Sequence, residues 1–320
     1  MRARVVLLFA ILLGAYTAPA AEVVRVGRWE LHSSFWMGLH QTLMHDASTR
    51  TPRDLAALTA EQKSAWDAAV ALYRTTAGRG SITFAQPMMN LQNDLTQVAD
   101  DAVELTLTGP LTDALRQVAP VYRSHWWESD DAANRFFIGY AAAMLRDAGE
   151  EIAAGHERLY RQRMPKAIRV DLAPYGGTFG AYAHSLRHGF TVTISSRDPG
   201  YTGLAALESV LHESSHSIVS PFHGTLAAAI EASSKKRGIE PPRDLWHAIL
   251  FATTSELTRR ALAARGAASY VPFSADLLTR AWPQYRVPIE THWLPYMNGQ
   301  GTLEEAVEKV VGMVKEAVGR

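Results

Sequence analysis

The spacing of apolar residues changes near residue 167, and this change constrains the fold more than any other feature of the chain. From Trp29 to Ala167, apolar residues recur mainly at intervals of three and four, the period of amphipathic helices. The stretches "AIRVDL" (167–172) and "FTVTISS" (190–196) instead alternate apolar and polar residues and contain many β-branched side chains, as strands do. Helical spacing returns after Gly203, over about 204–220, 224–237, 244–265 and 302–318.

This pattern predicts an α+β fold that is mainly α with a small antiparallel sheet. We expect a helical N-terminal region over residues 21–167, and the sheet with the remaining helices over residues 168–320. The stretch "TFGAYAHS" (178–185) is expected to pair with the strand that begins at Phe190, through a turn at Arg187 to Gly189.

The first residues, "MRARVVLLFAILLGAYTAPAAE", have the three parts of a secretory signal: basic residues, an apolar run, and small residues at a cleavage site. We predict a signal peptide over residues 1–20 and a secreted or periplasmic mature protein. The apolar run is short for a membrane span, which needs about 20 residues. We therefore expect no stable membrane insertion after cleavage, with an uncleaved anchor as the alternative.

Composition excludes some classes of partner and of site. The chain has 32 basic and 32 acidic residues, so it carries no basic field that would attract nucleic acid. It also has no cysteine. An exported protein of this length must then rely on its core rather than on disulfides, and any metal site must use histidine and carboxylate ligands.

The stretch "LHESSH" (211–216) contains the pattern H-E-x-x-H within a segment of helical spacing that ends at Pro221. On a helix, His212 and His216 lie one turn apart on the same side and can bind one Zn²⁺. Glu213 is rotated by about 100° from His212, so it can act as general base on a zinc-activated water without being a ligand. The alternative is a partly exposed helix whose histidines bond to neighbouring hydroxyls.

A catalytic zinc ion needs a third protein ligand as well as an open position for water. Glu256 falls on the apolar face of a later predicted helix, where a carboxylate needs a partner that zinc would supply, and we favour it. An ion pair between Glu256 and Arg260 would satisfy the same carboxylate. Glu231 is a second candidate ligand, and His223 lies one residue too late for the extended H-E-x-x-H-x-x-G-x-x-H pattern.

With these residues, the chain resembles the gluzincin branch of zinc metallopeptidases, the thermolysin-like group. In that group H-E-x-x-H on one helix is joined by a glutamate from a following helix, and the matching residues here are His212, Glu213, His216 and Glu256. The resemblance covers roughly residues 175–265 and implies a zincin-like catalytic core, one Zn²⁺ per chain and a peptide or protein substrate. One departure is Arg260, which stands where the family often has an aspartate that orients a zinc histidine.

The resemblance also implies a substrate-binding strand. In the gluzincins an antiparallel edge strand upstream of the zinc helix binds the substrate backbone, because a free edge offers unpaired N–H and C=O groups. The stretch "GAYAH" is expected to take this role. Its residues are Gly180, Ala181, Tyr182, Ala183 and His184.

The same resemblance implies a side chain that stabilises the negative charge on the attacked carbonyl oxygen. The family uses a tyrosine or histidine from beyond the zinc ligands. We favour Tyr270, which follows the expected ligand helix closely, while Tyr285, His292 and Tyr296 remain candidates.

Together these features predict an exported zinc-dependent hydrolase, a metallopeptidase in which Glu213 is the general base. The alternative is a non-catalytic exported helical protein that uses the same residues for a structural or transport-related metal site. Such a closed site would have a fourth protein ligand in place of water, with His223 or His184 as the candidates. A metal-free binding protein is a third possibility.

Overall fold

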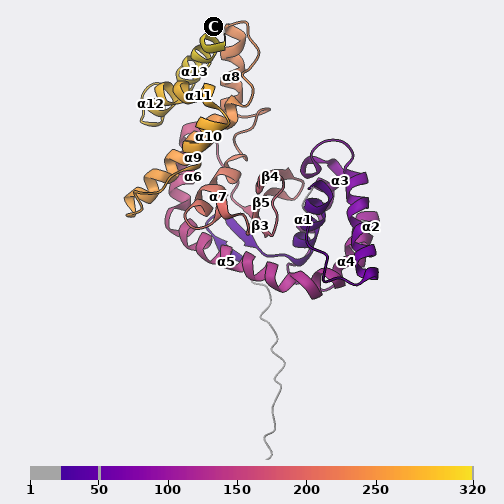
Figure 1. Ribbon diagram of the computed structural model, residues 1–320. Helices are drawn as coiled ribbons and strands as arrows, with labels where there is room; N and C mark the ends of the chain where they lie inside the picture. The colour runs from indigo at the N-terminus through magenta and orange to yellow at the C-terminus, as the bar shows by residue number, and fades with distance from the viewer. Residues whose placement is uncertain (1–22, 50–51, 319–320) are drawn as a thin grey trace, which may run out of the picture.

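Figure 1 shows a computed structural model of the chain, which describes residues 23–49 and 52–318. The signal peptide predicted for residues 1–20 lies outside the described residues. Most of the described chain is helical, and one small sheet lies between two groups of helices (Figure 1). Within the described ranges, no helix has the length and apolar character that crossing a bilayer requires.

The sheet has five strands in the spatial order β1-β2-β3-β5-β4. The strand pairs β1–β2 and β4–β5 are antiparallel, whereas β2–β3 and β3–β5 are parallel. The α+β class is therefore confirmed, but the sheet is mixed rather than antiparallel throughout. The strands are β1 (Val24–Val26), β2 (Trp29–His32), β3 (Ile168–Ala173), β4 (Ala181–Leu186) and β5 (Gly189–Ser195).

The predicted hairpin of β4 and β5 is confirmed, with Leu186 opposite Gly189 across a two-residue turn. Gly189 has φ 137°, a conformation that glycine adopts at low cost. The hairpin leaves β4 as the last strand of the sheet, paired on one side only. Helical spacing predicted from Trp29 onward was wrong for β2, because a strand of four residues is too short to show its own period.

The helices form two hydrophobic cores. The first core includes one face of the sheet and the helices α5 (Glu128–Met144), α6 (Glu150–Tyr160), α7 (Ala205–Ser215), α8 (Thr225–Lys236), α9 (Leu245–Ala264), α10 (Phe273–Arg280), α11 (Pro283–Pro288), α12 (Leu294–Met297) and α13 (Leu303–Val318). The second core is formed by α1 (Phe35–Ser48), α2 (Ala60–Ala77), α3 (Gln86–Leu95) and α4 (Pro110–Tyr122). Short 3₁₀ turns include η1 (Ile82–Phe84) and η4 (Pro199–Tyr201), and π turns include η2 (Arg123–Trp127), η3 (Leu145–Gly149) and η5 (Ile289–Trp293).

The boundary expected at residue 167 does not separate these cores. Trp29 and Leu31 of β2 are fully buried in the first core, together with residues of α7 and α9 from the C-terminal half. The N-terminal half therefore supplies part of the sheet as well as the helices of the second core.

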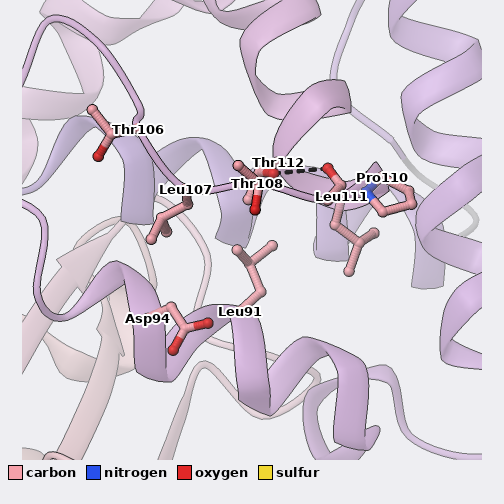
Figure 2. A pocket seen from close by; sticks show the side chains of 9 residues that line it. Leu91, Asp94, Thr106, Leu107, Thr108, Pro110, Leu111 and Thr112 are labelled. Carbon is pink, nitrogen blue, oxygen red and sulfur yellow. Dashed lines mark hydrogen bonds between the residues drawn. The ribbon is translucent and has the colours of Figure 1, made fainter.

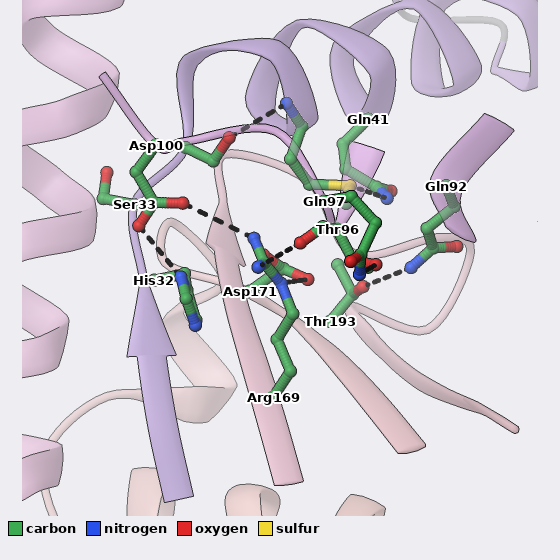
Figure 3. A network of polar contacts seen from close by, with 12 residues as sticks. His32, Ser33, Gln41, Gln92, Thr96, Gln97, Asp100, Arg169, Asp171 and Thr193 are labelled. Atoms are coloured by element: carbon green, nitrogen blue, oxygen red, sulfur yellow. Dashed lines mark hydrogen bonds and ion pairs between the residues drawn. The ribbon is translucent and has the colours of Figure 1, made fainter. Parts of the chain in front are cut away.

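A layer of buried polar side chains lies where the sheet meets the second group of helices (Figure 3). Arg169 of β3 pairs with Asp171 at 2.8 Å and with Asp100 at 3.5 Å, and Asp100 also contacts Nδ1 of His32 at 2.9 Å. These contacts matter because a buried charge is tolerated only when it is paired and hydrogen-bonded.

Substituting Arg169 tests this layer. Arg169→Ala would leave two buried carboxylates without their cation, and we expect it to lower the free energy of unfolding by about 3 to 5 kcal/mol. Arg280→Ala, which breaks an exposed pair with Asp276, is the matched control and should cost about 1 kcal/mol or less. Urea unfolding measures both; equal costs would show that the layer does not stabilise the fold.

Candidate metal centre

The H-E-x-x-H motif lies on α7, which is buried between the sheet and α9. Leu207, Val210 and Leu211 are fully buried there, so the helix is held from several sides. The helix ends at Ser215, and His216 is its C-cap residue rather than part of its middle. His216 still has helical dihedral angles, φ −60° and ψ −16°, so its one-turn spacing from His212 is kept.

Three histidines converge at this point: His212 and His216 from α7 and His247 from the first turn of α9. One ring nitrogen of each lies within 4.8 Å of the others. The Nε2 atoms of His212 and His247 are 3.2 Å apart. Two nitrogens bound to a tetrahedral Zn²⁺ at about 2.0–2.1 Å lie about 3.3 Å from each other, so this spacing suits a shared metal ion.

The rings have the neutral form that metal ligands need. Burial lowers the pKa of His216 to about 4 and that of His247 to about 3, and it takes the pKa of His212 well below its usual value, helped by the two neighbouring imidazoles. Nδ1 of His216 lies 3.4 Å from the carbonyl oxygen of Val219, which can only accept a hydrogen bond. The hydrogen is therefore on Nδ1, and Nε2 keeps its lone pair for a metal.

Glu213 lies beside His216 and is buried. One of its carboxylate oxygens is 3.9 Å from Nε2 of His216. Burial raises the pKa of Glu213 to about 8, since the charged form loses its hydration. A cation held by the histidines would favour the ionised carboxylate again.

The structure corrects the expected third ligand. Glu256 lies nine residues after His247 on α9, a rise of about 13 Å along the helix. Its carboxylate is held by Arg259 at 2.7 Å and by Arg260 at 2.6 Å. The ion pair considered as the alternative for Glu256 is thus the one formed, and His247 is the third residue of the group that could hold a metal ion.

The other residues considered as ligands also lie outside the group. Glu231 and His223 are exposed, on α8 and on the loop before it. His184 of β4 contacts Gln92 at 3.1 Å in the polar layer. None of these three belongs to the group of ligand atoms found at His212, His216 and His247.

The three tyrosines expected to stabilise a carbonyl oxygen are engaged elsewhere. Tyr270 donates a hydrogen bond to Glu208 at 2.5 Å, one turn before His212 on α7. Tyr285 donates to the carbonyl oxygen of Arg243, and Tyr296 donates to that of Leu159. Sequence position alone had favoured Tyr270, but its hydroxyl is committed to a buried carboxylate.

Tyr201 is a residue near Glu213 that the sequence did not reveal. It lies on η4, which packs against α7, and the charge of Glu213 adds to burial in raising its pKa. Its hydroxyl donates to the carbonyl oxygen of Phe179 at 2.5 Å, and its ring occupies the space that a side chain on Gly180 would need. Tyr201 therefore lies between Glu213 and the start of β4.

The stretch from Gly180 to His184 forms the start of the sheet's edge, as the sequence predicted. The carbonyl oxygen of Gly180 accepts a hydrogen bond from the amide of Ser195 at 2.7 Å, so it points toward β5. Because successive residues of a strand point their backbone groups to opposite sides, Ala181 and Ala183 present N–H and C=O groups to the free edge. The side chains of Tyr182 and His184 are buried in the polar layer, where both contact Gln92.

A separate hollow of about 490 Å³ lies in the second group of helices (Figure 2). It is lined by Leu91 and Asp94 of α3 and by residues 106–112, which lead into α4. Its walls contain one carboxylate and no histidine, so it does not extend the metal centre.

Comparison with known proteins adds no relative: no family model, curated protein or solved structure matches the chain. The resemblance to the gluzincins therefore rests on the residues of this chain alone. His247 in place of the expected glutamate is a departure from that group.

Glu208, one turn before His212 on α7, offers a test of how burial changes the pKa of a carboxyl group near the candidate metal centre. It is fully buried and accepts hydrogen bonds from Ser255 and Tyr270, yet burial raises its pKa to about 7. A carboxyl group whose pKa is raised on folding stabilises the fold below pH about 4.5, and this contribution is lost as the pH rises through about 7.

Glu208→Gln removes this titration. The free energy of unfolding of the variant relative to the unsubstituted protein should therefore rise by about 3 kcal/mol between pH 4.5 and pH 8. Urea unfolding of both proteins at several pH values gives this difference. The effects of the other titrating groups cancel, because both proteins contain them. A difference that stays constant or falls with pH would contradict the neutral state of Glu208.

Proposed function

We propose that the protein is an exported zinc-dependent hydrolase that cleaves peptide bonds. The observation that carries this proposal is the convergence of His212, His216 and His247 beside the buried Glu213. The proposal of export rests on the tripartite N-terminal sequence, residues 1–20.

The donor set fits zinc. Three imidazole nitrogens would serve as ligands of a Zn²⁺ ion and would leave a position for water or substrate, as in catalytic zinc sites. When bound, Zn²⁺ would lower the pKa of a water molecule to about 7 and polarise a carbonyl group. His212, His216 and His247 are neutral ligands, so the full charge of the ion would remain available at the fourth position.

Glu213 takes the acid–base role in this proposal. Glu213 accepts the proton from the attacking water and later passes it to the leaving amine, and its position beside His216 suits that role. Tyr201 lies between Glu213 and the start of β4, but its hydroxyl is engaged by the carbonyl oxygen of Phe179 just as that of Tyr270 is by Glu208, so we assign stabilisation of the carbonyl oxygen to the charge that a bound metal ion would supply.

The edge strand β4 supports a peptide as substrate. An extended peptide can pair with the outward backbone groups of Ala181 and Ala183, as in other cases where a strand is added to a sheet. Strand β4 packs against α7, so a peptide bound there lies beside the helix that carries Glu213.

A structural or transport-related metal site is the second candidate. In such a site a fourth protein ligand would occupy the coordination position that is otherwise open to water, as in structural zinc sites. Among the described residues the group of ligand atoms holds three histidines, and the side chain of His216 is 19% exposed. This opening to solvent favours the catalytic proposal.

Substitution of Glu213 tests the mechanism. The purified protein should bind about one zinc per chain, and Glu213→Gln should keep the metal while losing about 10²- to 10⁴-fold in hydrolysis, the usual contribution of a general base. Zinc is measured by elemental analysis, and cleavage is measured by mass spectrometry of an unstructured protein such as casein.

Two further variants test whether His247 or Glu256 is the third metal ligand. His247→Ala should lower zinc affinity strongly, whereas Glu256→Gln should retain the metal; circular dichroism confirms that each variant is folded. A Glu213→Gln protein with full activity would refute the mechanism. Zinc lost from Glu256→Gln but kept by His247→Ala would reverse the ligand assignment.

A further inference from the structure

The hollow in the second group of helices has walls that are held by hydrogen bonds. Helix α3 forms one side with Leu91 and Asp94, and residues 106–112 form the other (Figure 2). Arg116 of α4 donates a hydrogen bond to the carbonyl oxygen of Leu107 at 2.6 Å. The segment that leads into α4 is therefore fixed in place, although it is neither helix nor strand.

The size and the lining of the hollow suit a small organic molecule. Its volume is about 490 Å³, within the range of about 300–1,000 Å³ that is usual for ligand sites. Leu91, Leu107 and Leu111 supply apolar surface, and the side chains of Thr108 and Thr112 lie among them. A molecule with an apolar body and one polar group matches this lining.

The charges around the hollow favour a cation as the polar group. Asp94 lines the hollow, and its carboxylate accepts a hydrogen bond from the side-chain amide of Asn93 at 3.1 Å. Of the described residues that line the hollow, none is basic. Residues 91–115 contain five acidic residues and no lysine, arginine or histidine. A bound cation therefore gains a carboxylate partner, whereas an anion is repelled.

The N-terminus of α4 also borders the hollow, and its partial positive charge opposes a cation. This partial charge is about half a unit charge, whereas Asp94 carries a full negative charge. Pro110, the first residue of α4, has no N–H group that could bind an anion. Arg116 adds no net charge, because it pairs with Asp113. The balance of charge around the hollow is therefore negative.

We propose that this hollow binds a small organic amine in its protonated form, with an apolar or aromatic body. The ammonium group donates hydrogen bonds to the carboxylate of Asp94 and to the hydroxyl oxygen of Thr108, because it has three donors and no acceptor. The body packs on Leu91, Leu107 and Leu111. The inference is independent of the proposed function, because the lining of the hollow and the three histidines of the metal centre are different residues.

Three phenyl compounds of similar size test the proposal: 2-phenylethylamine, which is protonated at neutral pH, 2-phenylethanol, which is uncharged, and 3-phenylpropanoate, which is an anion. Binding to the full chain is followed by methyl NMR of isotope-labelled leucine, with a chelator present so that no metal ion takes part. The amine should bind about tenfold or more tightly than the alcohol, and the anion should bind more weakly than both. The signals that shift should be those of Leu91, Leu107 and Leu111.

Variants then locate the bound cation. Asp94→Asn should remove most of the preference for the amine over the alcohol, while the alcohol binds as before. Asp101→Asn is the matched control, because it removes the same charge from the same acidic segment, but Asp101 is exposed and does not line the hollow. The control should keep most of the preference. Leu111→Ala shortens the apolar wall and should weaken the binding of the amine and the alcohol alike.

Equal affinity for the amine and the alcohol overturns the inference, as does a preference that Asp94→Asn keeps. An equal loss of preference in Asp94→Asn and Asp101→Asn would show a general effect of the acidic surface rather than a site, and it also overturns the inference. If Asp94→Asn does not fold, the three compounds on the unsubstituted protein still decide, together with the leucines whose signals shift. These results leave the proposed function untouched, because zinc binding and cleavage test it separately.

Discussion

The contact between α7 and α9 is the constraint on which the candidate site depends. It brings His247 against His212 and gathers three imidazoles, one buried and two partly buried, at one point. Burial without a charged partner keeps these rings neutral, and neutral imidazole is the form that binds a metal ion. The same packing buries Glu213 and Glu208, so the polar residues of α7 share one environment that is poor in water.

The sheet and its polar layer hold this arrangement in place from the other side. The β4–β5 hairpin packs on α7 and leaves one backbone edge free. On its opposite face, the sheet meets the second group of helices through paired and hydrogen-bonded side chains such as Arg169 and Asp171. The polar interface and the candidate metal centre thus lie on the two faces of one sheet.

The parts of the fold and site that are local in sequence were predictable. The α7 motif and the β4–β5 hairpin depend on the period of apolar residues and on one glycine turn, which are visible within a few residues. Strands β1 and β2 were missed, because short strands leave little periodicity to detect.

The third histidine of the candidate metal centre was not predictable in the same way. Glu256 was chosen because a carboxylate on an apolar helix face needs a partner, but Arg259 and Arg260, three and four residues away, supply it. His247 and Tyr201 reach the site only through the packing of α9 and η4 on α7, and no fixed spacing relates them to the motif. A histidine flanked by tryptophan at the start of an apolar helix was the signal available for His247.

The central claim is that three histidines hold one metal ion and leave a position open. X-ray absorption at the zinc edge of the metal-loaded protein tests it most directly. The structure predicts three imidazole nitrogens at about 2.0–2.1 Å and one further oxygen from solvent, with two imidazoles remaining in His247→Ala. Four protein ligands, or a spectrum that His247→Ala leaves unchanged, would contradict the account.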